Sequence, residues 1–278
     1  MPELPEVQTI VDELNQSGIV GCAIEDVEVF WPRTVANENL EVFRKSLQGQ
    51  RIVELKRRAK YLIFTLSSGD SLCVHLRMTG RLLLVKDISV DNPHIRLRLI
   101  LDQKRTLDYY DTRKFGRWTL VSDLTTLFGK IGPEPLSAEF TAQRFWEMLN
   151  RHARALKTLL LDQSFLAGLG NIYVDEALWE SQLHPLQRSN TLTHAQAKHL
   201  HQSIVLVLKR GIESQGTTLG TGKSNYYRLD GSRGKHQTLL QVFRRTGQPC
   251  PRCGEAIERL IVAQRSTHIC PKCQNQTL

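Results

Sequence analysis

The segment Cys250-Pro251-Arg252-Cys253 is followed, after sixteen residues, by Cys270-Pro271-Lys272-Cys273. Two Cys-x2-Cys pairs at this separation are typical of a zinc ion held by four thiolates on two knuckles. Two disulfides are the alternative, but the first thirty residues contain no Lys or Arg and so do not read as a secretory signal. The spacing therefore predicts a C-terminal ribbon with one structural Zn²⁺, bound by Cys250, Cys253, Cys270 and Cys273.

Upstream of the ribbon, short runs rich in branched and apolar residues are separated by turn sequences such as Ser67-Ser68-Gly69-Asp70. They predict strands at 24–30, 51–55, 61–66, 71–76, 81–85, 95–101, 106–110 and 117–121. Strands at this spacing indicate a β-sandwich or a barrel. Before them, apolar residues at helical periodicity predict a helix over residues 3–17, with Gly18 as its stop.

The sequence Gly132-Pro133-Glu134-Pro135 interrupts the strand pattern, and helical periodicity follows it. Helices are expected at 141–150, 155–161, 172–182 and 193–214, then a glycine-rich polar loop at 216–235. We predict an α+β multidomain chain: a β-sandwich beginning with a helix (1–133), a helical segment that includes the loop (134–238), and the zinc ribbon (239–278).

Charge is spread unevenly along the chain. The formal net charge is +9, yet residues 1–30 carry seven acids and no bases. A basic body with an acidic N-terminus suits a protein that binds a polyanion and has a carboxylate-rich chemical centre. The alternative is a soluble protein that happens to be basic. Because no apolar run approaches the length of a membrane helix, a cytoplasmic protein is expected.

The opening Met1-Pro2-Glu3-Leu4-Pro5-Glu6-Val7 permits two interpretations. Removal of Met1 would leave Pro2 with a free secondary amine, which can attack an electrophilic carbon and form an iminium. Glu3 and Glu6 would then share one helical face beside that nucleophile. The other interpretation is an ordinary helix start, with proline in the first turn and acids favoured by the helix dipole.

Five further segments carry side chains suited to contact with a nucleic acid. Asn171 follows Gly168-Leu169-Gly170 at a helix start, which is either a phosphate-binding terminus or a tight helix–helix turn. Lys60 precedes a strand, where it either enters a phosphate-binding cleft or protects a sheet edge. Met78, Arg113 and Phe115 could fill the gap left by an extruded base, although Met78 could equally be core. Arg265 lies between the knuckles, where the metal would hold it rigidly enough to clamp a phosphate.

Six motifs in this order resemble the bacterial formamidopyrimidine-DNA glycosylase family over residues 2 to about 274. They are Pro2-Glu3-Leu4-Pro5-Glu6-Val7, Arg58-Ala59-Lys60-Tyr61-Leu62, His75-Leu76-Arg77-Met78-Thr79-Gly80, Arg113-Lys114-Phe115-Gly116-Arg117, Gly170-Asn171-Ile172-Tyr173 and the four-cysteine ribbon. The resemblance implies a base-excision-repair enzyme that removes 8-oxoguanine and formamidopyrimidines and then cleaves the strand by β,δ-elimination. It also implies that the helical segment is a helix-two-turn-helix domain.

The resemblance further implies a role for each site residue. Pro2 is the nucleophile that forms a Schiff base, Glu3 its acid/base partner, and Lys60 and Arg265 support β- and δ-elimination. The DNA contacts that it implies are His75, Met78, His94, Arg113, Phe115, Arg154, Lys157 and Asn171. Within the loop at 216–235, the candidate contacts with the flipped base are Gly222, Asn225 and Tyr226.

Two alternative functions stay open on the sequence. One is the endonuclease VIII activity, which applies the same chemistry to oxidised pyrimidines, although Leu4 fits that branch less well. The other is a non-catalytic zinc-ribbon protein that only binds DNA. The expected partner is double-stranded DNA with a damaged base, and the protein is expected to act as a monomer in the bacterial cytoplasm, near the nucleoid.

Overall fold

The computed structural model describes residues 1–86, 92–220 and 226–275, which form two compact units. The first comprises Met1–Gly129 and Ser214–Gln237, and the second Lys130–Glu213 and Thr238–Leu278. The segment expected as a loop of the helical domain therefore belongs to the first unit, and the ribbon belongs to the second together with the helices. Gly222 and Asn225 lie outside the described residues.

The first unit is the predicted β-sandwich with its leading helix. Helix α1 (Leu4–Gln16) comes first, and η1 (Pro32–Thr34), α2 (Leu40–Leu47) and α3 (Thr125–Phe128) lie between or after strands. The strands are β1 (Ile24–Val29), β2 (Ile52–Arg58), β3 (Tyr61–Leu66), β4 (Ser71–His75), β5 (Gly80–Lys86), β6 (Ile95–Leu101), β7 (Arg105–Asp111) and β8 (Arg117–Val121). All eight predicted strands are present, with ends shifted by no more than three residues.

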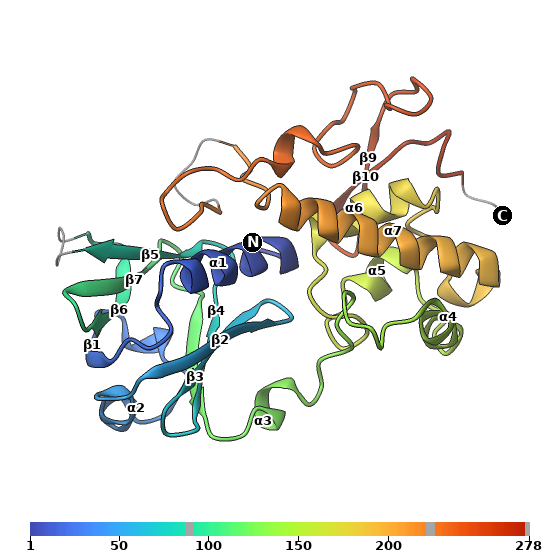
Figure 1. Cartoon of the computed structure of the whole chain (residues 1–278). Coiled ribbons are helices and arrows are strands. Elements are labelled where there is room, and N and C mark those ends of the chain that lie inside the picture. The colour runs from blue at the N-terminus through green and yellow to red at the C-terminus, as the bar shows by residue number, and fades with distance from the viewer. Residues whose placement is uncertain (87–91, 221–225, 276–278) are drawn as a thin grey trace. The chain divides into compact units, whose positions relative to one another are not determined.

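Two antiparallel four-stranded sheets make the sandwich (Figure 1). Their strand orders are β1-β6-β7-β5 and β2-β3-β4-β8. Alternate side chains of both sheets, such as Phe64 and Leu99, meet in one apolar core that also takes in Val7 and Leu14 of α1. Burial of its apolar face thus holds α1, and with it the N-terminal segment, against the sandwich.

The second unit contains the helices and the ribbon. Its helices are α4 (Ala142–Asn150), α5 (Leu156–Leu160), α6 (Asn171–Glu180), η2 (Ser189–Thr191) and α7 (His194–Glu213), and η3 (His236–Thr238) lies where the two units divide. A hairpin of β9 (Glu258–Val262) and β10 (Arg265–Ile269) completes the ribbon. Helix α6 is buried from Ile172 to Trp179 and packs against α7 and β10. Since α6 is enclosed, its polar side chains must find partners inside the unit.

Candidate active site

The predicted site residues fall into two groups, one in each unit. Helix α1 positions the first group, because Glu3 is its N-cap and Pro2 precedes it. The backbone N–H of Glu3 donates to Oε2 of Glu6 at 2.8 Å, which fixes the entry into the helix. Pro2 and Glu3 are buried, whereas Met1 is 49% exposed. Loss of Met1 would leave the Pro2 nitrogen as a free amine, one residue before the buried Glu3.

Glu6 also connects this segment to residues 214–237, a link that the sequence did not predict. Its Oε1 accepts the backbone N–H of Thr217 at 2.8 Å. Gly216 makes the approach possible, because its φ is +76° and an added Cβ would lie 2.9 Å from the Glu6 Cγ. One carboxylate thus bridges the N-terminal segment and the start of the segment expected to cover an extruded base.

Tyr226, a candidate base contact, has a different place in the structure. Its ring is part of the sandwich core, 6% exposed, and its hydroxyl donates to the carbonyl of Gln215 at 3.2 Å. Burial, with the nearby carboxylates of Glu6 and Glu13, raises the pKa of the phenol. The side chain of Tyr226 therefore anchors residues 214–237 in the sandwich core.

Lys60 lies at the turn between β2 and β3, where Ala59 takes a left-handed conformation (φ 52°). The lysine is 5% exposed, and Arg57 donates to the Ala59 carbonyl at 2.9 Å, which stabilises the turn. The interpretation of Lys60 as a solvated charge that protects a sheet edge is thus wrong, since the side chain is buried. A buried ammonium is costly and is a strong candidate for a functional group.

His75, at the end of β4, is buried next to these cations. Burial lowers the pKa of its imidazole to about 3, and the charges of Arg77 and Lys60 add to the effect. Its Nδ1 accepts the backbone N–H of Arg77 at 3.0 Å, which assigns the ring proton to Nε2. We therefore expect His75 to be neutral at physiological pH and able to donate from Nε2.

The buried imidazole makes stability depend on pH in a defined direction. The unfolded chain takes up a proton at His75 below about pH 6.5, but the folded chain does not, so stability falls as the pH falls from 6.5 towards 3. The contribution is about 1.4 kcal/mol per pH unit in that window. Urea unfolding at pH 7, 6 and 5 should show this loss, and the His75→Asn variant should lack it. Parallel pH profiles for the two proteins would contradict the assignment.

Met78, Arg113 and Phe115 are brought together on the surface of the first unit. The guanidinium of Arg113 donates to Sδ of Met78 at 3.1 Å and lies 4.7 Å from the centre of the Phe115 ring. Met78 is 39% and Phe115 is 47% exposed, so the interpretation of Met78 as plain core is wrong. His94 is exposed too, and its carbonyl accepts the N–H of Asp111, which begins the loop that carries Arg113.

Asp111 organises this loop and was not singled out from the sequence. Its carboxylate, fully buried, accepts hydrogen bonds from the Thr79 hydroxyl, the Arg113 N–H (3.1 Å), the Tyr109 hydroxyl (3.1 Å) and the Gly116 N–H (2.8 Å). Gly116 is required because an added Cβ would lie 1.6 Å from the Tyr109 hydroxyl. One buried acid thus sets the backbone of both segments that carry the exposed triad.

In the second unit, Asn171 is the first residue of α6 and Arg265 the first of β10. The Nδ2 of Asn171 donates to the Ser266 carbonyl at 2.9 Å, so the amide lies against the strand that begins with Arg265. Arg265 is exposed and directly follows a two-residue turn, Ala263-Gln264, in which both φ angles are positive (49° and 60°). Arg154 is exposed as well and pairs with Asp162 at 2.8 Å.

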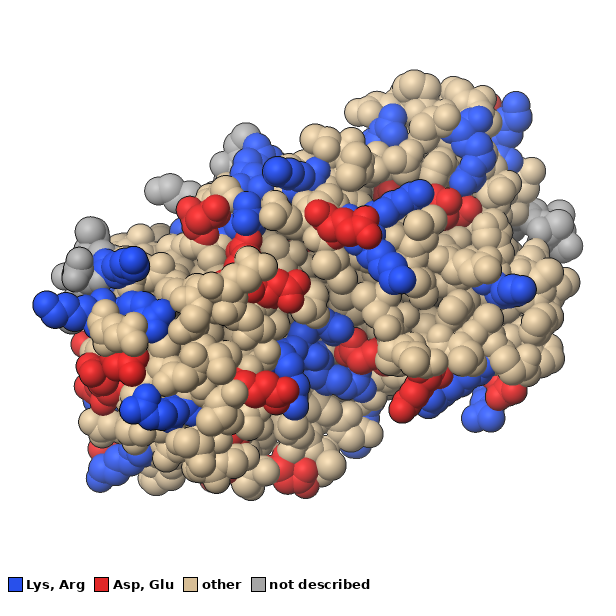
Figure 2. Space-filling model, viewed as in Figure 1, with Lys and Arg blue, Asp and Glu red and all other residues tan. Residues whose placement is uncertain are grey.

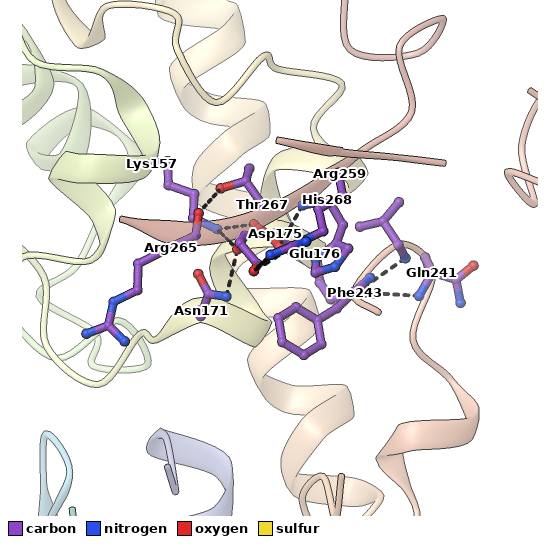
Figure 3. A network of polar contacts seen from close by, with 12 residues as sticks. Lys157, Asn171, Asp175, Glu176, Gln241, Phe243, Arg259, Arg265, Thr267 and His268 are labelled. Atoms are coloured by element: carbon purple, nitrogen blue, oxygen red, sulfur yellow. Dashed lines mark hydrogen bonds and ion pairs between the residues drawn. The ribbon is translucent and has the colours of Figure 1, made fainter. Parts of the chain in front are cut away.

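Lys157 does not lie where a DNA contact requires it. Its side chain is 0% exposed, and its ammonium is held by the Asp175 carboxylate and, at 3.3 Å, by the Ser266 carbonyl (Figure 3). With no accessible surface, this lysine cannot touch a phosphate, and the expectation of a direct contact is corrected to an internal structural role.

The four predicted zinc ligands converge. Their sulfur atoms all lie within 4.8 Å of one another, with Cys253 to Cys270 at 3.4 Å and Cys250 to Cys273 at 3.9 Å. These distances exclude disulfide bonds and suit a tetrahedral ion with Zn–S bonds of about 2.3 Å. Zinc is therefore structural, since four thiolates leave no open position for substrate.

The surroundings of the cluster shift the pKa values of its thiols in opposite directions. Burial opposes ionisation of the Cys250 thiol, but hydrogen bonds from the Trp179 indole and from the N–H groups of Arg252 and Cys253 lower its pKa to about 6. Burial raises the pKa of Cys270 to about 12, so this thiol loses its proton only when the metal binds. The donor set thus fits one Zn²⁺.

Basic and acidic side chains are interspersed over the face seen in Figure 2, so the positive net charge does not form one continuous surface there. Searched over the described ranges, the chain has no helix long and apolar enough to span a membrane. A metal-rigidified hairpin that presents arginine, an asparagine at a helix start and an exposed Met-Arg-Phe triad define a nucleic-acid-binding protein.

Comparison with known proteins gives the family. Residues 1–118 match the formamidopyrimidine-DNA glycosylase N-terminal domain, residues 131–223 the H2TH domain of the same glycosylase, and residues 247–276 a zinc finger found in FPG and IleRS. The chain belongs to the formamidopyrimidine-DNA glycosylase family, and it is a base-excision DNA glycosylase.

Relatives match over the full length. The formamidopyrimidine-DNA glycosylase of Protochlamydia amoebophila is 55% identical over 276 residues, which cover 99% of this chain and 100% of that protein. That of Herpetosiphon aurantiacus is 44% identical over 276 residues, with the same coverage of both proteins. A Lactococcus lactis Fpg complex with DNA containing an abasic site is 40% identical, with a TM-score of 0.90 and coverage of 99% of this chain and 100% of that one.

Proposed function

We propose that this protein excises oxidised purines, 8-oxoguanine and formamidopyrimidines, from duplex DNA through a Schiff base on Pro2 and then cleaves the strand. The observation that carries the proposal is the start of α1, where Pro2 precedes a buried Glu3. Structures similar to this one include complexes with DNA that contains Fapy-dG, an abasic site or carbocyclic 8-oxo-G. We also propose that the protein acts as a monomer in the cytoplasm.

The chemistry assigns one task to each residue. The free amine of Pro2 forms a bond to C1′ of the sugar as the glycosidic bond breaks, and the base leaves. Opening of the C1′–O4′ bond gives the iminium, and Glu3 supplies the proton that O4′ takes up. Loss of a C2′ proton then expels the 3′-phosphate, and a second elimination expels the 5′-phosphate. Lys60 and Arg265 support these two eliminations by proton transfer or by binding the leaving phosphates.

The DNA contacts are proposed in the same way. His75, His94, Asn171 and Arg154 would bind the backbone, and exposed Met78, Arg113 and Phe115 would fill the gap left by the extruded nucleotide. The mechanism requires removal of Met1, because an acylated Pro2 nitrogen is an unreactive amide.

Borohydride trapping tests the nucleophile. A duplex with 8-oxoguanine opposite cytosine is incubated with the protein and borohydride, and the cross-linked peptide is mapped. We expect an adduct on the N-terminal peptide. A matched control with one glycine added before Pro2 should give no adduct on the Pro2 nitrogen, because that nitrogen is then an amide. An adduct on Lys60 in place of Pro2 would refute the assignment.

The same assay distinguishes the endonuclease VIII alternative. We expect excision of 8-oxoguanine opposite cytosine to be much faster than excision of thymine glycol, under single-turnover conditions with each duplex in turn. A strong preference for thymine glycol would overturn the proposed substrate class while leaving the Schiff-base chemistry intact.

Arg265→Ala is expected to weaken DNA binding and to lower the slope of log K against log salt by about 1, as for one lost phosphate contact. Titration of a labelled duplex at several salt concentrations measures the slope. Lys272→Ala, which removes one exposed charge from the neighbouring knuckle, is the matched control. An unaltered slope in Arg265→Ala would show that the guanidinium does not touch the backbone.

A further inference from the structure

A single buried carboxylate binds β10, the strand that carries Arg265. Asp175, on α6, is 1% exposed, and its Oδ1 accepts from the Lys157 ammonium. Its Oδ2 accepts the backbone N–H of His268 at 3.0 Å and lies 3.0 Å from Nδ1 of the His268 ring (Figure 3). Asp175 therefore holds β10 at His268 through both the main chain and the side chain.

Side chains of α5 and α6 bind β10 at a second point, Ser266. The Ser266 carbonyl accepts from Nζ of Lys157 at 3.3 Å and from Nδ2 of Asn171 at 2.9 Å. Asn171 and Asp175 are four residues apart in α6 and so share one helical face. The strand is thus fixed at both neighbours of Thr267, and Ser266 directly follows Arg265.

Glu176 secures the other side of α6. Its carboxylate accepts the backbone N–H groups of Gln241 (2.8 Å), Val242 (3.0 Å) and Phe243 (2.9 Å), where the chain enters the ribbon. The Phe243 ring in turn packs edge-on against the His268 ring, with centroids 5.0 Å apart. The ribbon is therefore clamped to α6 at its entry and along β10.

Burying these charges costs free energy, and the contacts restrict the geometry of β10. The side chains of Lys157 and Asp175 are both fully buried, so their charges repay desolvation only when every partner is in place. By contrast, Arg265 is exposed, and Figure 3 shows its guanidinium extended away from the network. The costly contacts thus hold the backbone on which the exposed arginine depends, and they do not touch the arginine itself.

We propose that Asp175 and His268 are positioning residues. They hold β10 so that Arg265 can bind the 5′-phosphate that leaves in the second elimination. Neither residue touches the substrate. The inference rests on the proposed role of Arg265, and it adds two residues to which the resemblance gives no role. It predicts that loss of either contact impairs the step assigned to Arg265 while formation of the Schiff base at Pro2 continues.

The test compares two readouts on a duplex with one abasic site. The ratio of δ- to β-elimination products reports Arg265, and the yield of borohydride trapping reports the Pro2 chemistry. His268→Phe keeps an aromatic ring at this position and the backbone N–H bond to Asp175, but it removes the Nδ1 contact. Folding should therefore be preserved. We expect the δ/β ratio to fall about threefold or more, with trapping unchanged. His268→Asn, whose amide occupies the place of Nδ1, should restore the ratio.

Two further variants test the role of the buried charge of Asp175. Asp175→Asn should lower the ratio further than His268→Phe does, and Glu258→Gln, an exposed carboxylate on β9, is its matched control. Because Asp175→Asn leaves Lys157 buried without its partner, the double variant Lys157→Met/Asp175→Leu removes both charges and should also show the low ratio. Zinc content is measured in each protein to establish that the ribbon is loaded.

A double-mutant cycle with Arg265→Ala makes the inference falsifiable. In the Arg265→Ala background, His268→Phe should have no further effect on the ratio. An unchanged ratio in zinc-loaded His268→Phe and Asp175→Asn, or effects that add to those of Arg265→Ala, would overturn the proposal. If Arg265→Ala itself leaves the ratio unchanged, the role of Arg265 falls and the positioning role with it, whereas trapping still reports the Schiff base independently.

Discussion

Replacement of Glu3 by glutamine is expected to slow base excision by about 10²-fold or more while duplex binding stays nearly intact. Glutamine has the size of glutamate but cannot deliver a proton to O4′. The bond from the Glu3 N–H to Glu6 belongs to the main chain, so the start of α1 should survive the change. Single-turnover excision of 8-oxoguanine and titration with an uncleavable duplex measure the two effects separately.

Glu25→Gln is the matched control for Glu3→Gln, because it removes an equal charge from an exposed position on β1. Its excision rate should equal that of the parent protein. A parental rate in Glu3→Gln would remove Glu3 from the mechanism, and equal losses of binding and excision would assign it to DNA contact instead.

Replacement of Asp111 by alanine is expected to lower the free energy of unfolding by about 3 kcal/mol or more, because four donors lose a buried, charged acceptor. The loop that carries Arg113 and Phe115 would lose its anchors, so base excision should also fall by about 10- to 100-fold, as expected when positioning groups move by an ångström. Urea unfolding and single-turnover excision measure the two effects.

Asp123→Ala provides the comparison for Asp111, since Asp123 is exposed and its carboxylate accepts the N–H and the hydroxyl of Thr125 within its own turn. The free energy of unfolding of Asp123→Ala should stay close to that of the parent protein. A similarly small loss in Asp111→Ala would show that the loop is held by other contacts.

Most of the sandwich could be predicted from the sequence, because short runs rich in branched and apolar residues, separated by turn sequences, mark its strands. Helix α2 was missed. It has eight residues, but its signals are present: Asn39 caps it by accepting the Val42 N–H at 3.0 Å, and Phe43 and Leu47 lie one turn apart and are buried. A short helix among strands is easily overlooked when periodicity is sought over longer windows.

The contacts that fix the site could not be predicted from local sequence patterns, because they join residues far apart in the chain. Lys157 belongs to a basic segment and was expected on the surface, yet its partner Asp175 lies 18 residues away, and His268 lies 93 residues beyond Asp175. Asp111 acquires its role only when β5 pairs with β7 and brings Thr79 beside it. By contrast, the cysteine spacing alone was sufficient for the zinc site, because thiolate pairs on knuckles form their ligand geometry locally.

The assignment of residues 214–237 to the first unit has a consequence for synthesis. On the ribosome, the sandwich emerges well before the segment that supplies the Thr217 N–H to Glu6, the Tyr226 ring to the core and the Leu229 N–H to Glu13. Until that segment is released, two carboxylates of α1 lack these donors and the core lacks an aromatic ring. The nascent sandwich can therefore complete its core and satisfy the two carboxylates of α1 only after the whole helical segment has been translated.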